Sequence, residues 1–500
     1  MTARWMLRAL RWTALAAVAP ALWACNARTL EKPALKPEQS VTKSFSQSIN
    51  RDVDLLFMVD NSSSMRLSQD NLRKNFPAFM NRLADPPGLP NIHVAVVSSD
   101  MGAGYGDVSG CDASSGPSNP GGNKGIFQYS ARGDCTATNL QPGATFISNV
   151  AGQANYTGNL ADVFSCIAAL GDQGCGFEHQ FASVLRALGA DGSAPGSTDR
   201  PPPAENQGFL RPNAYLVVIF ITNEDDCSSA VEPQFFDVAS NWSQKSQLGE
   251  TFRCNEFGHL CKTGGGALMH PDRNAPGNDA TATVSYDMCT SDDASGYLIG
   301  VKDTAARLKA LKSDPSEVLV AAITGPTAPY VVHWKNPTPP DTSCGAAACP
   351  WPEITHSCMA ADTSYADPAI RITDLVSEFG PNGLVLSICD DSFAPALDKI
   401  ATLIDQTLTP PCITQAIANK PGTSDPDCTI TSHTPDGAGG TINTAIPACS
   451  ANGNAAPCWH LEAGTCADGT TGQVVKVSAD PSVTTSTAQN ATINCALAPS

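Results

Sequence analysis

Five apolar runs, separated by segments with a helical spacing of apolar residues, dominate the chain up to Cys389. The runs are Val53–Asp60, Ile92–Ser99, Ala214–Thr222, Glu317–Thr324 and Gly383–Cys389. Nearly continuous apolar runs of this length are typical of strands in a parallel sheet that is covered on both faces. The pattern therefore predicts a five-stranded parallel core.

Segments between these runs carry apolar residues on one helical face. The predicted helical faces are Leu72, Phe76, Phe79, Met80 and Leu83; Phe181, Val184, Leu185 and Leu188; Leu308 and Leu311; and Leu397, Ile400, Leu403 and Ile404. Pro77 is expected to kink or shorten the first helix. Alternating strands and helices predict an α/β fold with a doubly wound, mostly parallel sheet.

Long loops interrupt this pattern at about residues 101–145, 227–290 and 326–370. They hold nine cysteines between them, so disulfides are expected to keep them ordered. After Pro410 the chain becomes rich in Thr, Ala, Gly and Pro. Residues 411–500 are predicted to form a small cysteine-rich module of short strands and turns.

The first 24 residues have the form of an export signal, with Arg4, Arg8 and Arg11 before a short apolar stretch. That stretch is too short to span a bilayer. It ends in Leu22-Trp23-Ala24-Cys25, which resembles the lipobox of bacterial lipoproteins and implies a lipid on Cys25. The alternative is an ordinary secretory signal with an incidental cysteine. Residues 25–49 are predicted to be a polar tether.

The cysteine count and the net charge indicate in which compartment the protein resides and which partners it does not bind. Of 19 cysteines, one is Cys25, twelve lie from Cys111 to Cys389 and six lie from Cys412 to Cys495. Both groups are even, so each can close its own disulfides, which indicates an oxidising compartment. The net charge of −18 argues against nucleic acid as a partner.

The first apolar run ends in Asp60-Asn-Ser62-Ser-Ser64. A buried strand would deliver one carboxylate and two hydroxyls to its carboxyl end, where open α/β sheets bind their ligands. These hard oxygen donors suit a Mg²⁺-like cation.

Together with the α/β alternation, this motif closely resembles the von Willebrand factor type A family and its metal-ion-dependent adhesion site, over about residues 50–410. The resemblance implies a divalent cation held by Asp60, Ser62 and Ser64. It also implies a Thr from a later loop, an Asp after the fourth strand, and an open coordination position for an acidic group of the partner.

Two of the family's positions differ in this chain. The strand ending at Thr222 is similar to the family's fourth strand, but Asn223 stands at the Asp position, followed by Glu224 and Asp225. A neighbouring carboxylate would substitute, or Asn223 would ligate through its amide oxygen. The loop that corresponds to the Thr-bearing one contains no Thr, and Glu178 is its nearest oxygen donor.

Several predicted strands also end in acids, at Asp60, Asp100, Glu224–Asp226 and Asp390-Asp391. In a parallel sheet these carboxylates would converge on one edge and raise the local cation affinity. The alternative is that Asp is simply common in turns and at helix N-caps.

Other chemistry is less well supported by the sequence. Cys254, His259 and Cys261, and His356 beside Cys358, include zinc-ligand types, but they lack a paired CxxC frame and disulfides are favoured. The chain has neither a GxSxG nor an HExxH motif, so an enzyme is not expected.

We therefore predict a cell-envelope lipoprotein that binds a protein or matrix partner, one that offers a carboxylate, through a divalent cation. Mg²⁺ is the expected ion, with Mn²⁺ and Ca²⁺ as alternatives. In the best-studied lipoprotein sorting system an Asp after the lipidated cysteine causes inner-membrane retention, so Asn26 favours the outer membrane. The alternative is a structural envelope protein whose metal site is degenerate and whose disulfide-stapled loops make the contacts.

Overall fold

The computed structural model describes residues 40–46, 51–85, 88–103, 122–230, 234–236, 250–336, 350–408, 412–435, 441–453, 455–466, 470–478 and 490–498. The chain groups into two compact units. One comprises Met1–Val41, Ala416–Asp427 and Cys495–Ser500, and the other comprises Thr42–Gln415 and Cys428–Asn494. The predicted signal and Cys25 lie outside the described residues.

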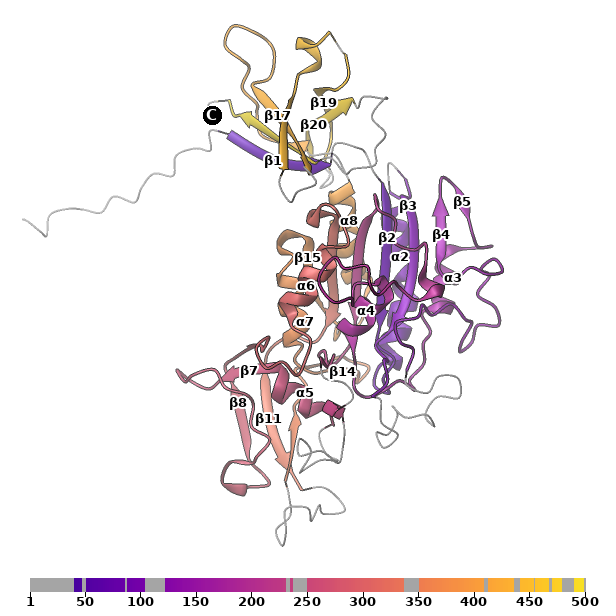
Figure 1. The fold of residues 1–500 in the computed structure, drawn as a ribbon, viewed down its shortest axis with the longest axis vertical. Helices are drawn as coiled ribbons and strands as arrows, with labels where there is room; N and C mark the ends of the chain where they lie inside the picture. Colours follow the sequence, from indigo (N-terminus) through magenta and orange to yellow (C-terminus); the bar gives the residue numbers. More distant parts are fainter. Residues whose placement is uncertain are drawn as a thin grey trace, which may run out of the picture. The chain divides into compact units, whose positions relative to one another are not determined.

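A seven-stranded mixed sheet forms the centre of the larger unit (Figure 1). Its strands, in spatial order, are β15 (Gly383–Ser387), β10 (Val318–Thr324), β6 (Tyr215–Ile221), β2 (Asp52–Val59), β3 (Asn91–Ser98), β4 (Ile147–Val150) and β5 (Gln153–Ala154). The first five pair in parallel, whereas β4 and β5 pair antiparallel. All five predicted strands are confirmed, and the antiparallel edge was not predicted.

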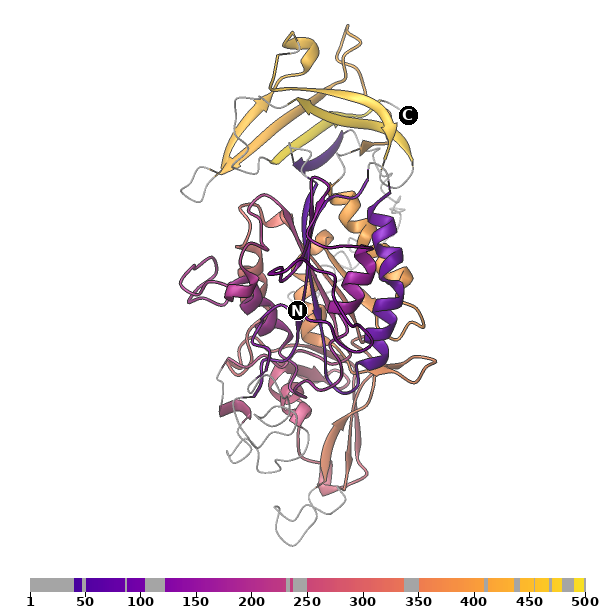
Figure 2. The ribbon, with the colours of Figure 1, turned by 90° about the vertical axis from the view of Figure 1, so that its right-hand side faces the viewer.

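Helices cover both faces of this sheet. The first face carries α2 (Arg66–Leu83), α3 (Leu160–Ile167) and α8 (Ala394–Leu408), and the second carries α4 (Gln180–Leu188), α6 (Val301–Lys309) and α7 (Ile370–Ser377). Alternate residues of β2 point to the two cores: Phe57 packs in the first and Met58 in the second. Helices α2 and α8 lie side by side on the first face (Figure 2).

Pro77 does not end or shorten α2, which continues for 18 residues with the proline inside it. A proline has no N–H and leaves the carbonyl four residues earlier without its helical donor. That carbonyl belongs to Arg73, and the hydroxyl of Ser165 on α3 donates to it at 3.4 Å. A neighbouring helix therefore compensates for the missing bond, which a single-helix pattern does not reveal.

The long insertions contain more regular structure than their sequence indicates. They hold α5 (Glu250–Gly258) and the strands β7 (His259–Lys262), β8 (Thr283–Tyr286), β9 (Met288–Ser291), β11 (Tyr330–Lys335), β12 (Trp351–Ile354), β13 (Cys358–Met359) and β14 (Tyr365–Ala366). Strands β12, β11 and β8 form a small sheet, and β7 pairs with β9. These strands have six residues or fewer, so the sequence pattern does not resolve them.

The C-terminal segment is built from two further sheets. One has the order β1 (Ser40–Ser46), β21 (Asn490–Ala496), β17 (Cys428–Pro435) and β18 (Thr441–Ile446), and the other has the order β16 (Cys412–Ile413), β20 (Thr471–Ser478) and β19 (Cys458–Thr465). Strand β1 corrects the prediction that residues 25–49 are only a tether. Its sheet partner comes from the far end of the chain, so local sequence does not predict it.

The described disulfides join Cys135 to Cys166, Cys227 to Cys254, Cys261 to Cys289, Cys358 to Cys389, Cys412 to Cys466 and Cys449 to Cys458. Every pair stays within its predicted group. Cys254, Cys261 and Cys358 are all in disulfides, which confirms the prediction that these cysteines form disulfides rather than bind zinc. Among the helices that the structure describes, none has both the length and the apolar character to cross a membrane.

An aromatic cluster anchors α2 and α3 to β2. The rings of Phe76 and Phe164 stack with centroids 3.5 Å apart, and the ring centroids of Phe57 and Phe164 are 4.8 Å apart.

We expect Phe76→Ala to lower the free energy of unfolding by about 3–5 kcal/mol, because it leaves a cavity in this core. Urea unfolding followed by circular dichroism measures the change. Leu67→Ala, in the same helix at 36% exposure, is the control, and an equal effect of the two would contradict the packing argument.

Candidate metal site

Three parallel strands end at the candidate site. Strand β2 leads to Asp60, β3 leads to Ser99 and β6 leads to Thr222, and the N–H of Asp60 donates to the carbonyl of Ile221 at 2.9 Å. Neighbouring parallel strands bring their carboxyl ends to the same edge, where α/β sheets place ligands. The register of the sheet therefore fixes where Asp60 stands.

The carboxylate of Asp60 is completely buried and accepts hydrogen bonds on both oxygens. Oδ1 accepts from the backbone N–H of Ser62 at 2.8 Å and from the hydroxyl of Ser99 at 3.2 Å. Oδ2 accepts from the hydroxyl of Thr222 at 2.7 Å. Burial raises the pKa of Asp60, and these hydrogen bonds oppose the rise.

Ser62, Ser64 and Asn223 form a row of oxygen atoms beside Asp60. The two serine hydroxyl oxygens are 3.2 Å apart, and Ser64 donates to the amide oxygen of Asn223 at 3.1 Å. The amide nitrogen of Asn223 donates to the backbone carbonyl of Tyr365 at 3.1 Å, which turns its oxygen towards the serines. The structure thus brings Asn223 to the motif in the orientation that a ligand would need.

A buried glutamine, Gln69, links the loop that contains Gly171 and Gly174 to the Asp60 motif through hydrogen bonds. The side-chain nitrogen of Gln69, on α2, donates to the backbone carbonyls of Asp60 and Gly171, each at 2.8 Å. The N–H of Gly174 donates to the carbonyl of Asn61 at 2.8 Å. A Cβ on Gly174 would lie 2.5 Å from the Asn61 side chain, so only glycine fits this approach.

Glu178 follows that loop, and its side chain is buried beside Glu224 and Asp60. The side chains of Glu178 and Glu224 lie close enough together to shift each other's pKa. Burial, and then the charges of Glu224 and Asp60, hold the pKa of Glu178 well above its usual range. Burial, and then the charges of Asp367 and Asp60, raise the pKa of Glu224 to about 8.

The carboxylate of Asp225 accepts hydrogen bonds from residues outside the Asp60 motif. One of its oxygens accepts from His259 Nε2 and from the N–H of Arg371, both at 2.8 Å, and the other accepts from the N–H groups of Asp226 and Ile372. Burial alone would raise the pKa of Asp225, but the hydrogen bond from His259 contributes most to holding it below its usual value. The structure therefore does not bring Asp225 to the metal motif, in contrast to the sequence prediction.

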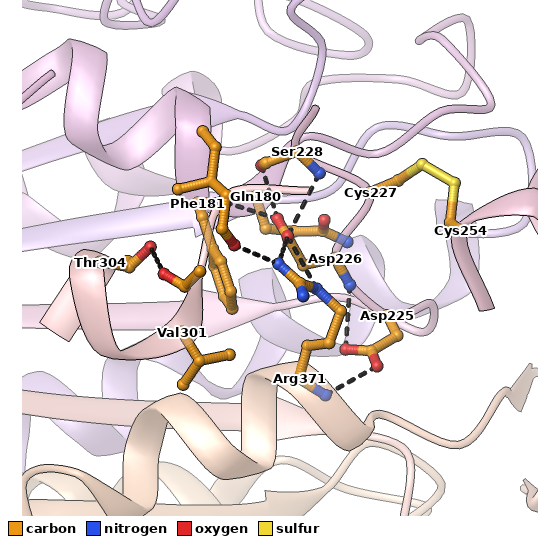
Figure 3. Close-up of polar contacts among 12 residues, drawn as sticks. Gln180, Phe181, Asp225, Asp226, Cys227, Ser228, Cys254, Val301, Thr304 and Arg371 are labelled. Carbon is orange, nitrogen blue, oxygen red and sulfur yellow. Dashed lines mark hydrogen bonds and ion pairs between the residues drawn. A yellow bond between two sulfur atoms is a disulfide. The ribbon is translucent and has the colours of Figure 1, made fainter. Parts of the chain in front are cut away.

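Asp226 forms a buried ion pair with Arg371, which Figure 3 shows together with Asp225. The guanidinium donates to Asp226 Oδ2 at 3.1 Å and lies 5.4 Å from the ring centroid of Phe181. Asp226 also accepts from the N–H of Phe181 at 2.9 Å and from the hydroxyl of Ser228 at 2.6 Å. This pair joins α4, α7 and the end of β6.

The remaining acids at strand ends have separate surroundings. Asp100 Oδ1 accepts from the N–H of Gly102 at 2.9 Å. The backbone carbonyls of Asp390 and Asp391 accept from Asn71 on α2. Of the acids that were expected to converge, Asp60 and Glu224 lie close enough to Glu178 for their charges to raise its pKa.

The donor set fits a hard divalent cation. It offers carboxylates, hydroxyls and an amide oxygen, and Oε1 of Glu178 is buried without a hydrogen-bond partner. Within the described parts of the chain, no group of three or more His, Cys, Asp or Glu side chains has metal-binding geometry by itself. Binding of a cation at this site would therefore require the hydroxyl oxygens as well as the carboxylates.

Sequence reasoning missed Gln69, Ser99 and Thr222. Thr222 ends a predicted strand, and its hydroxyl contacts Asp60, whereas the corresponding loop of the family was expected to supply the Thr. A polar residue that ends a buried strand next to the motif strand is the signal that could have identified both hydroxyl residues.

No family model and no curated protein matches this chain. Solved structures with some similarity include the pilus adhesin SpaC from Lactobacillus rhamnosus GG (14% identity, TM-score 0.29, covering 92% of this chain and 42% of that one) and the pilus adhesin RrgA from Streptococcus pneumoniae (10%, 0.25, 94% and 60%). A von Willebrand factor type A structure from Catenulispora acidiphila has 8% identity and a TM-score of 0.25, with 94% of this chain and 68% of that one covered. The chain thus spans less than two thirds of either adhesin, and similarity at this level establishes neither family nor function.

The raised pKa of Glu224 predicts that the stability of the cation-free protein depends on pH. Its pKa is about 8 when folded and about 4.3 when unfolded, so the folded state binds more protons between these values. Its contribution to stability is complete below pH 4 and is lost as the pH rises through 8. We expect the melting temperature of chelated wild-type protein to fall from pH 5 to pH 8 more steeply than that of Glu224→Gln. Parallel curves for the two proteins would contradict this assignment.

Because the Asp226–Arg371 ion pair is buried, we expect removal of the Arg371 guanidinium to lower stability strongly. We expect Arg371→Leu to cost about 3–5 kcal/mol in the free energy of unfolding, because it leaves a buried charge unpaired. Arg82→Leu breaks an exposed pair with Asp85 and should cost at most about 1 kcal/mol. Urea unfolding measures both variants. Similar losses would mean that burial does not govern the contribution of the pair.

Proposed function

We propose that this chain is an exported envelope lipoprotein, anchored through Cys25, whose doubly wound domain of von Willebrand A type binds a protein or matrix partner through a divalent cation. Asp60, Ser62 and Ser64 would hold the ion, with Asn223 and the carboxylates of Glu178 and Glu224 next to them. The proposed role is binding rather than catalysis, and the outer membrane is the proposed location.

The observation that carries this proposal is the arrangement around Asp60. One buried carboxylate lies next to two hydroxyls that are 3.2 Å apart, and the second hydroxyl faces an amide oxygen. Ser64 and Glu224 are only partly buried, so the row is reachable from solvent. Such oxygen-only sites select hard divalent cations over zinc or copper.

The bound ion would supply a positive charge at an edge of the sheet that otherwise carries acids. Because Ser62, Ser64 and Asn223 are neutral donors, they leave part of the charge of the ion unbalanced. A partner carboxylate would then be attracted to the ion as a further ligand, and its approach would depend on ionic strength.

A structural role with a degenerate metal site is the second proposal. The closeness of Glu178 and Glu224 favours it, because their raised pKa values let a proton take the place of an ion between the two carboxyl groups. The disulfide-linked insertions would then make the intermolecular contacts. Metal binding separates the two proposals.

We expect wild-type protein to bind Mg²⁺ or Mn²⁺ and Asp60→Ala to lose at least about 100-fold in affinity. Changes next to a metal ligand already cost about 10–100-fold, and Asp60 would be the anionic anchor. Isothermal titration calorimetry with the metal alone measures this loss. The control is Asp398→Asn, an acid with 61% side-chain exposure, on α8. A wild-type chain that takes up no Mg²⁺, Mn²⁺ or Ca²⁺ would refute metal-dependent binding and favour the structural role.

A further inference from the structure

Glu178 stands in the loop where the resembling family has a neutral threonine hydroxyl. Its side chain is 2% exposed, and its Oε1 is buried without a hydrogen-bond partner. Burial is the largest influence on its carboxyl, and the charges of Glu224 and Asp60 add to it by raising its pKa further. The ionised form of this carboxyl is therefore costly unless a positive charge lies next to it, and a cation bound at the motif would supply that charge.

The backbone holds Glu178 in this position. Its carbonyl accepts from the N–H of Cys227 at 2.8 Å, and the N–H of the next residue, His179, donates to the carbonyl of Ser99 at 2.9 Å. Cys227 is itself linked to Cys254 by a disulfide. The backbone of Glu178 is therefore held between Ser99, which follows β3, and Cys227, in the segment after β6.

The charge balance at a bound ion differs accordingly from that of a site built on one carboxylate. A divalent cation between Asp60 and neutral donors keeps one net positive charge, whereas a second carboxylate brings the net charge to zero. Coulomb attraction scales with that charge. If it bound the ion, the same carboxylate would also occupy a coordination position that an external acid would need.

We propose that Glu178 is a built-in carboxylate ligand of the cation, which competes with the acidic group of a partner for the same coordination position. This inference rests on the proposed function and adds its regulation. The ion is self-ligated in the resting protein, and an external carboxylate binds only by displacing Glu178. Glu178 therefore sets the threshold for partner binding.

Replacing Glu178 separates metal binding from carboxylate binding. The probes are Mn²⁺ alone and then Mn²⁺ with acetate, followed by water-proton relaxation, which reports the water molecules bound directly to the ion. The variants are Glu178→Thr, which introduces a short neutral hydroxyl, and Glu178→Gln, which keeps the size of the side chain and removes its charge. Glu378→Gln, an exposed acid at the end of α7, is the matched control.

We expect Mn²⁺ affinity to fall about tenfold in both Glu178 variants, because affinity for such ions follows the number of charged ligands. Glu178→Thr should gain about one inner-sphere water. Acetate should displace that water at a concentration at least about tenfold lower than in wild type. Glu378→Gln should match wild type in each measurement.

The outcomes are distinguishable. If wild type and both Glu178 variants bind Mn²⁺ with equal affinity, carry equal numbers of waters and respond equally to acetate, Glu178 is not a ligand and this inference is wrong, although the metal site stands. If wild type binds no Mn²⁺, the proposed function fails, and the inference fails with it. Thermal melts show whether Glu178→Thr is folded, and Glu178→Gln supplies the test if it is not.

Discussion

The carboxylate of Asp60 is the group on which the arrangement of the site depends. Removing a charged carboxylate from water is costly unless hydrogen bonds or a cation replace the lost hydration. Here the replacement comes from the N–H of Ser62 and from the hydroxyls of Ser99 and Thr222, which belong to the ends of three adjacent strands. The parallel register of β3, β2 and β6 is therefore also what places these donors around Asp60.

Adjacent acids after β6 have different roles because their neighbours differ. Glu224 faces Glu178, Asp225 accepts from His259, and Asp226 pairs with Arg371. His259 starts β7, within a disulfide-linked insertion, and its other ring nitrogen contacts the hydroxyl of Tyr330 at 2.9 Å. The insertion is thus hydrogen-bonded directly to Asp225, in the loop that carries Asn223 and Glu224.

The five parallel strands could be predicted to within two residues because each is a nearly continuous apolar run, a pattern that burial on both faces requires of β2, β3, β6 and β10. Strand β4 was missed because it has four residues and only Ile147 is fully buried. In the candidate site, Asp60, Ser62 and Ser64 could be grouped from the sequence because they lie within one short segment at the end of a predicted strand. The hydrogen bonds of Asp225 could not be predicted, because His259 and Arg371, which donate to its carboxylate, come from distant parts of the chain.

Glu178 shows how a single residue changes the chemistry expected from a motif. The serines and Asn223 alone would leave a bound cation electron-poor and attractive to an external acid. Glu178 adds a carboxylate whose Oε1 has no hydrogen-bond partner, and its backbone is tied to Cys227. The hydroxyl of Thr222, which follows β6, donates to Asp60. The contiguous motif therefore determines that hard oxygen donors are present, whereas the loop around Glu178 determines how much positive charge a bound ion would present to another molecule.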